Sequence, residues 1–193
     1  KCKFINRYIV STDDNEIKEY CMSVGVDVPF IRPSYLSSDN ATSVDALVHA
    51  VKFCEKQDNL KYDYIIELMA TNPFKNEFDI KSCLDKLIKT KSDSVIGVTQ
   101  LEDHHPARIK KIESDKLVDF CVPELSSRRQ DLRPFAYIRN GSIYAINRDS
   151  LINANHRFGG DNSRPHIMPQ ERSINVDNYI DLAICELLIS KNK

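Results

Sequence analysis

The chain has 193 residues, of which 41% are hydrophobic and 28% charged, and its formal net charge is -1 at pH 7. This length suits one sizeable domain, and we expect a single domain over residues 1–193. The balanced charge excludes the broad basic surface that nucleic-acid binding needs, and the apolar runs are far shorter than a membrane span, so we expect neither partner.

Six cysteines are scattered along the chain without the CxxC spacing of a metal or redox motif. Several fall on apolar helix faces, where reduced core thiols are common. No stretch resembles a signal peptide. These features predict a cytoplasmic location.

The first half of the chain alternates short apolar runs with helical patterns. Residues 8–10 and 28–31 are predicted strands, separated by a helix, and Ser43 is the expected cap of a second helix. Residues 64–68 then form a buried strand, and a third helix leads to a strand at 94–99. The alternation predicts an α/β fold, with helices covering both faces of a mostly parallel sheet.

The rhythm changes after residue 99, where an antiparallel excursion is predicted from about 100 to 140. Residues 108–112 and 117–121 flank a turn and form its hairpin. The dipeptide Asn140-Gly141 predicts a second hairpin, because it favours a tight two-residue turn. A last amphipathic helix follows at 180–188.

The segment from Ser173 to Asp181 is the strongest candidate for a metal site. In an extended chain Asn175 and Asp177 point to one side, and Asp181 follows Asp177 by one helical turn. A site with hard oxygen donors, of which only a few are carboxylates, suits Mg²⁺, because this ion keeps several waters and takes its other ligands from substrate phosphates. The alternative is an ordinary Asn or Asp cap at the start of the last helix.

Other familiar sites are excluded. The chain has five glycines and no GxGxxG or GxxxxGK arrangement, so an ordinary dinucleotide or P-loop site is absent from this sequence. No GxSxG occurs, and the histidines form no motif with a serine or cysteine. Ligands of open parallel sheets bind at the carboxyl ends of the strands, which here carry polar residues around 11–13, 32, 37–43 and 69–72.

Seven short stretches occur in the order in which one enzyme family carries them. They are Val10–Asp14, Phe30–Pro33, Ser38–Ser43, Leu68–Pro73, Arg128–Asp131, Asn140–Tyr144 and the segment around Asp177. With this set the chain resembles the CMP-sialic acid synthetases, or acylneuraminate cytidylyltransferases, over nearly its whole length. The resemblance implies a three-layer α/β/α, Rossmann-like nucleotidyltransferase fold. It also implies an enzyme that transfers CMP from CTP to the anomeric hydroxyl of a nonulosonic (sialic-acid-like) sugar acid and releases pyrophosphate.

The resemblance also implies roles for individual residues. Asp177 is the expected catalytic residue and principal Mg²⁺ ligand, with Asn175 and Asp181 beside it. Arg32 and Ser43 lie where the family holds the nucleotide. The excursion is expected to mediate a homodimer and to complete the neighbouring subunit's site. The expected sugar-acid residues are Met69, Thr71, Arg108, Arg129 and Gln130.

Three departures from the family pattern affect these expectations. Met69 stands where the family usually has Gln, and Asn175 where it commonly has Asp, so substrate choice and metal affinity are expected to differ. The Gly-rich and basic phosphate loop that opens the family is not found, and we expect about forty residues to precede this chain by the family's layout. An eight-carbon ulosonic acid as acceptor, or a non-catalytic dimerising or sugar-binding role, remains an alternative.

Overall fold

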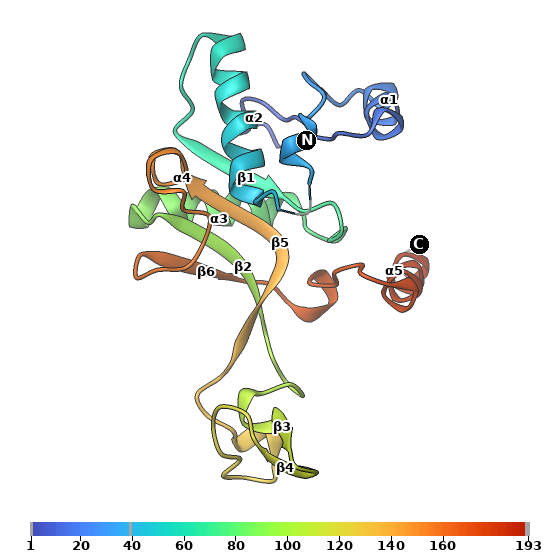
Figure 1. Cartoon of the computed structure of the whole chain (residues 1–193), viewed down its shortest axis with the longest axis vertical. Helices are drawn as coiled ribbons and strands as arrows, with labels where there is room; N and C mark the ends of the chain where they lie inside the picture. The colour runs from blue at the N-terminus through green and yellow to red at the C-terminus, as the bar shows by residue number, and fades with distance from the viewer. Residues whose placement is uncertain (1, 39, 192–193) are drawn as a thin grey trace. The chain divides into compact units, whose positions relative to one another are not determined.

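The fold is built on a four-stranded sheet flanked by helices, as seen in a computed structural model that describes residues 2–38 and 40–191 (Figure 1). Asp39, within the predicted Ser38–Ser43 motif, lies outside the described residues. The first strand runs antiparallel to its neighbour, with Leu68 opposite Ile143, so the sheet is mixed. In spatial order the strands are β1 (Tyr64–Leu68), β5 (Tyr137–Asn147), β2 (Ser94–Gln100) and β6 (Ser163–Ile167).

The helices confirm the predicted α/β class. The three helices expected in the first half of the chain are all present, and each begins after a side chain that caps its first turn. No helix in the described part of the chain is long and apolar enough to cross a bilayer. The helices are α1 (Asn15–Ser23), α2 (Ser43–Asp58), α3 (Glu77–Thr90), α4 (Arg148–Ala154) and α5 (Tyr179–Lys191).

The chain divides into two compact units, and the expectation of a single domain stays a prediction. The first unit comprises residues 1–68, 76–96 and 143–164, and the second 69–75, 97–142 and 165–193. In the first unit α3 packs against β1 and α2 contacts α4. Its core is formed by buried apolar side chains, chiefly Val51, Cys54, Ile80, Cys83, Leu87, Val95, Ile143, Ile146 and Leu151.

Two partly buried ion pairs reinforce the first unit. The Arg148 guanidinium donates to both carboxylate oxygens of Glu55 at 2.8 and 2.9 Å, which joins α4 to α2 and lowers the pKa of Glu55. Arg157 likewise donates to both carboxylate oxygens of Glu67, at 2.7 and 2.9 Å, and its guanidinium carbon lies 4.2 Å from the ring centre of Tyr144. Paired hydrogen bonds of this kind fix geometry as well as charge.

Two predictions near the N-terminus were wrong. Residues 8–10 and 28–31 form isolated parallel bridges, Ile9 with Asp27 and Thr12 with Ile31, instead of strands. Pro29 lies between the two bridges, and its ring nitrogen has no hydrogen to donate to a continuous ladder. The cap of α2 is Thr42 instead of Ser43, because the Thr42 hydroxyl accepts from the Asp45 amide at 3.1 Å and donates to its carboxylate.

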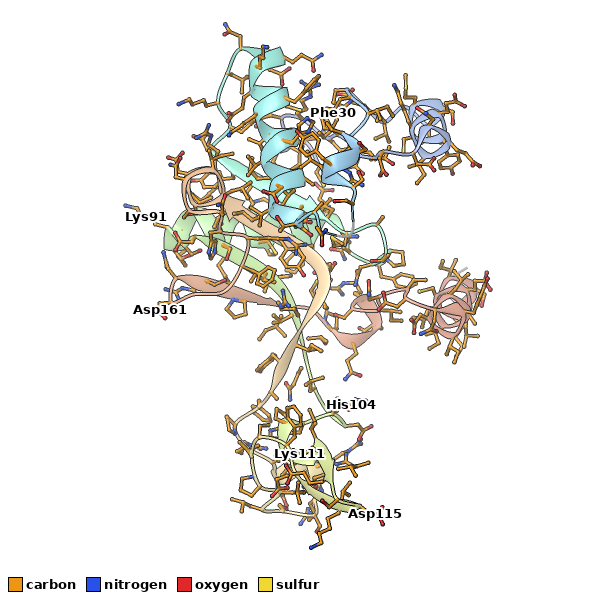
Figure 2. The ribbon with its side chains drawn as sticks, in the orientation of Figure 1. Phe30, Lys91, His104, Lys111, Asp115 and Asp161 are labelled. Carbon is orange, nitrogen blue, oxygen red and sulfur yellow. The ribbon has the colours of Figure 1, made fainter. Side chains whose placement is uncertain are left out.

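The predicted excursion is present, but its second hairpin is not. A hairpin of β3 (Lys110–Glu113) and β4 (Lys116–Asp119) turns at Asp115, labelled in Figure 2. The two ends of the excursion meet where the Leu101 amide donates to the Ala136 carbonyl at 2.9 Å. Asn140-Gly141 forms no hairpin turn, because β5 continues through both residues, with Gly141 at a φ of 69°. The sequence analysis also missed α4 and β6.

Candidate active site

Asn140 is the centre of a buried polar cluster in the second unit. Its side-chain nitrogen donates to the Ser173 hydroxyl at 2.9 Å, and its side-chain oxygen accepts from the Ser142 amide at 3.1 Å. The backbone carbonyl of Asn140 accepts from the side chain of Asn72 at 3.3 Å. Asn140 therefore holds three separate segments together, which explains why it forms no exposed turn.

The loop after β1 contacts this cluster through its backbone. The Met69 amide donates to the Ser142 carbonyl at 3.2 Å, and the Thr71 carbonyl accepts from the Val176 amide at 2.8 Å. Lys75 closes the loop, because its ammonium donates to the carbonyls of both Met69 and Asn72. Two predicted substrate residues, Met69 and Thr71, are thus brought next to the predicted metal segment.

The three predicted metal residues lie together. The Asn175 side-chain nitrogen donates to an Asp177 carboxylate oxygen at 2.7 Å, and Asp177 is exposed. One Asp181 oxygen accepts from the backbone amides of Asp177 and Asn178, at 3.0 and 3.2 Å. Asn178 in turn accepts from the Ile180 and Asp181 amides, so Asn178 and Asp181 together cap α5. The predicted helix cap and the predicted metal residues thus share one segment, and Asn175, Asp177 and Asp181 are called the metal corner below.

This donor set fits a magnesium ion that takes most of its ligands from elsewhere. Asp177 provides one exposed carboxylate, and the oxygen of the Asn175 amide is a second hard donor. Among the described residues no group of three or more His, Cys, Asp or Glu side chains is placed to hold a metal. A site of this kind would need water and substrate phosphates to complete the shell of a Mg²⁺ ion.

The excursion brings two predicted substrate arginines onto one carboxylate. Asp103 accepts from Arg129 at 2.6 Å and lies 3.5 Å from a guanidinium nitrogen of Arg108. The hydrogen bond from Arg129 lowers the pKa of Asp103. Gln130 lies beside Arg128, and its amide oxygen would accept from that guanidinium at 3.2 Å once the amide is turned over. The two guanidinium groups therefore share an acid group of the chain itself.

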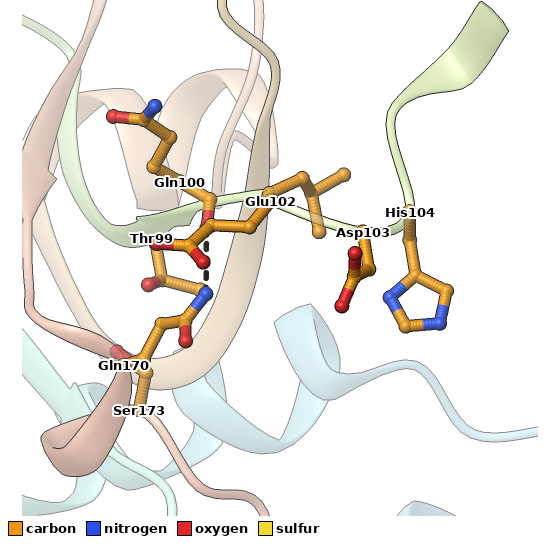
Figure 3. Close-up of a pocket in the computed structure, with 8 residues that line it drawn as sticks. Thr99, Gln100, Glu102, Asp103, His104, Gln170 and Ser173 are labelled. Carbon is orange, nitrogen blue, oxygen red and sulfur yellow. Dashed lines mark hydrogen bonds between the residues drawn. The ribbon is translucent and has the colours of Figure 1, made fainter. Parts of the chain in front are cut away.

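Two hollows of the second unit adjoin these residues. One, of about 310 Å³, is lined by Asp103, His104, Arg108 and Ile109. The other, of about 320 Å³, is drawn in Figure 3, where the Gln170 side chain donates to the Gln100 carbonyl at 3.4 Å. Its lining residues are predominantly polar: Thr99, Gln100, Leu101, Glu102, Asp103, His104, Gln170 and Ser173.

The two predicted nucleotide residues lie in the first unit. Arg32 donates to the Ser37 hydroxyl at 2.9 Å and to the Asp13 carboxylate at 2.8 Å, which lowers the pKa of Asp13. The backbone of Arg32 also donates to the Thr12 carbonyl at 2.8 Å. Ser43 is the first residue of α2 and is exposed. Both side chains are accessible to a ligand.

Comparison with known proteins identifies the family, because residues 1–154 match the model of the family described as Cytidylyltransferase. The chain belongs to the cytidylyltransferase family. This cytidylyltransferase is 27% identical over 188 residues to the pseudaminic acid cytidylyltransferase of Campylobacter jejuni, covering 95% of the chain and 78% of the relative. It is 27% identical over 191 residues to the CMP-N,N'-diacetyllegionaminic acid synthase of Legionella pneumophila, covering 96% of the chain and 78% of that relative.

A solved structure supports the fold of this cytidylyltransferase. CMP:2-keto-3-deoxy-manno-octonic acid synthetase, solved in complex with CTP, aligns with a TM-score of 0.68 at 15% identity. The alignment covers 100% of the chain and 84% of the solved protein. The predicted nucleotidyltransferase-like α/β fold and the predicted nucleotidyltransferase activity are therefore confirmed.

Sequence reasoning missed three residues that organise the site. Asn140 was interpreted as a plain turn residue, although its place directly before Gly141 in a family motif was a signal. Lys75 follows the Leu68–Pro73 motif by two positions, which was a usable sign of a loop anchor. Asp103 had no sequence signal, because its partner Arg129 is 26 residues away.

Proposed function

We propose that this cytidylyltransferase transfers CMP from CTP to the anomeric hydroxyl of a nonulosonic acid and releases pyrophosphate. The observation that carries the proposal is the position of Asp177, exposed beside Asn175 in a segment tied to the loop after β1. Two relatives of this chain are named for nonulosonic acids, pseudaminic and diacetyllegionaminic acid, which supports this acceptor class.

Asp177 is the residue proposed to bring Mg²⁺ to the reacting phosphate. A bound Mg²⁺ would neutralise charge on the triphosphate as the α-phosphorus is attacked. Asn175 orients the Asp177 carboxylate through its 2.7 Å hydrogen bond, and the capped start of α5 fixes the backbone that follows. The chain thus contributes position and charge, which are the main requirements of phosphoryl transfer.

Arg108 and Arg129 are proposed to bind the carboxylate of the sugar acid. Their guanidinium groups now share the Asp103 carboxylate, so an acid ligand would take over existing hydrogen-bond donors. Gln130 and Met69 are proposed to contact other parts of the acceptor. In the first unit Arg32, held by Ser37 and Asp13, is proposed with Ser43 for the nucleotide.

A homodimer and a cytoplasmic location complete the proposal. Large apolar side chains are exposed on the excursion, where a second subunit would cover them. The six cysteines are free thiols, which suits a reducing compartment. The exposed side chains include Ile109, Ile112, Leu117, Phe120 and Leu125.

The test is pyrophosphate release from CTP at increasing Mg²⁺, measured with pseudaminic, legionaminic, neuraminic and eight-carbon ulosonic acids. Release with one nine-carbon acid, reduced by about a hundredfold or more in Asp177→Ala, is expected. Asp85→Ala, at an exposed position of α3, is the matched control and should retain full activity. Release only with the eight-carbon acid would refute the acceptor class, and no release with any acid would refute the proposed reaction.

A further inference from the structure

We propose that Lys75 is a positioning residue for the metal corner, acting through the loop between Met69 and Asn72. Its catalytic consequence rests on the proposed function, whereas its structural consequence does not. Lys75 lies at the end of the loop and donates to the Met69 carbonyl at 2.8 Å and to the Asn72 carbonyl. A single ammonium thereby draws the two ends of the loop together.

The position of Lys75 indicates a half-buried lysine that holds the loop through hydrogen bonds, instead of a solvated surface charge. Its side chain is half-buried, and burial lowers the pKa of its ammonium. No carboxylate forms an ion pair with it among the described residues, so the two loop carbonyls are its recorded hydrogen-bond acceptors. An ammonium without a countercharge is stable in such a place only when its donors are satisfied.

The closed loop then fixes the metal segment from two sides. The Thr71 carbonyl accepts from the Val176 amide at 2.8 Å, and Val176 directly precedes Asp177. Asn72, fully buried, donates to the Asn140 carbonyl at 3.3 Å, and Asn140 holds Ser173 at 2.9 Å. Both ends of the segment that carries Asn175 are therefore attached to a loop that Lys75 shapes.

The experiment compares three single variants. Lys75→Met keeps the length of the side chain but removes every donor, and Lys75→Arg keeps a cation with several donors. Lys81→Met is the matched control, because Lys81 is an exposed lysine whose recorded bond is an i,i+4 pair with Asp85 at 2.6 Å. If Lys75→Met does not fold, Lys75→Gln takes its place, because its shorter, uncharged side chain cannot donate to both loop carbonyls as the ammonium does, and Val176 exchange should still rise relative to Lys75→Arg.

The first readout is hydrogen exchange of the Val176 amide in the free protein, which needs neither metal nor substrate. Lys75→Met should raise its exchange rate about fivefold to tenfold relative to a buried core amide such as that of Leu87. Lys75→Arg and Lys81→Met should leave the rate within about twofold. Unchanged Val176 exchange in Lys75→Met would overturn the proposal, and so would an equal increase at Leu87, because the effect would then be global.

The second readout is the Mg²⁺ concentration that half-saturates pyrophosphate release. Lys75→Met should raise it about threefold to tenfold with a smaller change in KM for CTP, and Lys75→Arg should restore it. Equal half-saturation in Lys75→Met and wild type would refute the link from Lys75 to Asp177. Inactivity of the wild type would refute only the proposed function, since the exchange experiment still decides the role of Lys75.

Discussion

Gly97→Ala is expected to destabilise the protein, because a Cβ at this position would collide with the Asn140 cluster. An ideal Cβ on Gly97 lies 2.7 Å from the side-chain oxygen of Asn140 and 3.3 Å from the Met168 sulfur. The oxygen cannot withdraw freely, since it accepts from the Ser142 amide at 3.1 Å. Ser142 is fully buried, so its amide has no water to replace that bond.

Whether Gly97→Ala stabilises or destabilises the protein tests the collision with Asn140. Without a collision, Ala in place of Gly within a strand stabilises by roughly 0.5–1 kcal/mol. Overpacking of a tight core costs about 1–3 kcal/mol, so we expect a net loss of about 1–2 kcal/mol for Gly97→Ala. For a chain of this size that loss lowers Tm by about 2–8 °C.

Urea unfolding of Gly97→Ala, Asn140→Ala and the double variant measures the collision directly. Asn140→Ala removes the oxygen that the new Cβ meets, so in that background Gly97→Ala should cost less than about 0.5 kcal/mol. The reasoning fails if Gly97→Ala costs the same in both backgrounds, or if it stabilises the wild type.

Three further outcomes follow from the geometry. Glu55→Gln should lower the free energy of unfolding by about 1–3 kcal/mol at pH 7. Because Arg148 lowers the pKa of Glu55, this loss should be fully present above about pH 4.3 and shrink as the pH falls through the lowered pKa of the folded state. Acid unfolding of the two proteins measures it, and a loss that does not change with pH would contradict the reasoning. Arg129→Lys should raise KM for the sugar acid about tenfold with little change in kcat, because a lysine cannot form paired hydrogen bonds; an unchanged KM contradicts this. Asn175→Asp should lower the half-saturating Mg²⁺ concentration, because it adds a carboxylate beside Asp177, and coincident titration curves would contradict it.

The regular elements were predictable because periodicity and caps act locally. The predicted third helix corresponds to α3, where Asn76 and Asp79 form a reciprocal capping box. Residues 64–68 form β1 as predicted. The isolated bridges near the N-terminus show the limit of this reasoning, since one proline within an apolar run prevents a ladder.

The error at Asn140-Gly141 has a long-range cause. A dipeptide that favours a tight turn in isolation lies within β5 here, because Asn140 bonds to Ser173, 33 residues away, and to Asn72, 68 residues away. Such contacts leave no local pattern. The proximity of Asn175, Asp177 and Asp181 could be predicted because they are close along the chain, whereas the loop that contacts their segment could not.

The hydrogen bond at the base of the excursion allows the sequence of the excursion to change without changing the sheet. Because Leu101 and Ala136 are hydrogen-bonded to each other, the 34 residues between them form a loop whose ends are already joined. Changing the length of such a loop alters its closure entropy only slowly, by roughly 0.6 kcal/mol per doubling. Arg108 and Arg129 both lie within it. Under the proposed function, acceptor preference can therefore diversify by exchange of this segment, in evolution or by grafting, while the strands beside it keep their pairing.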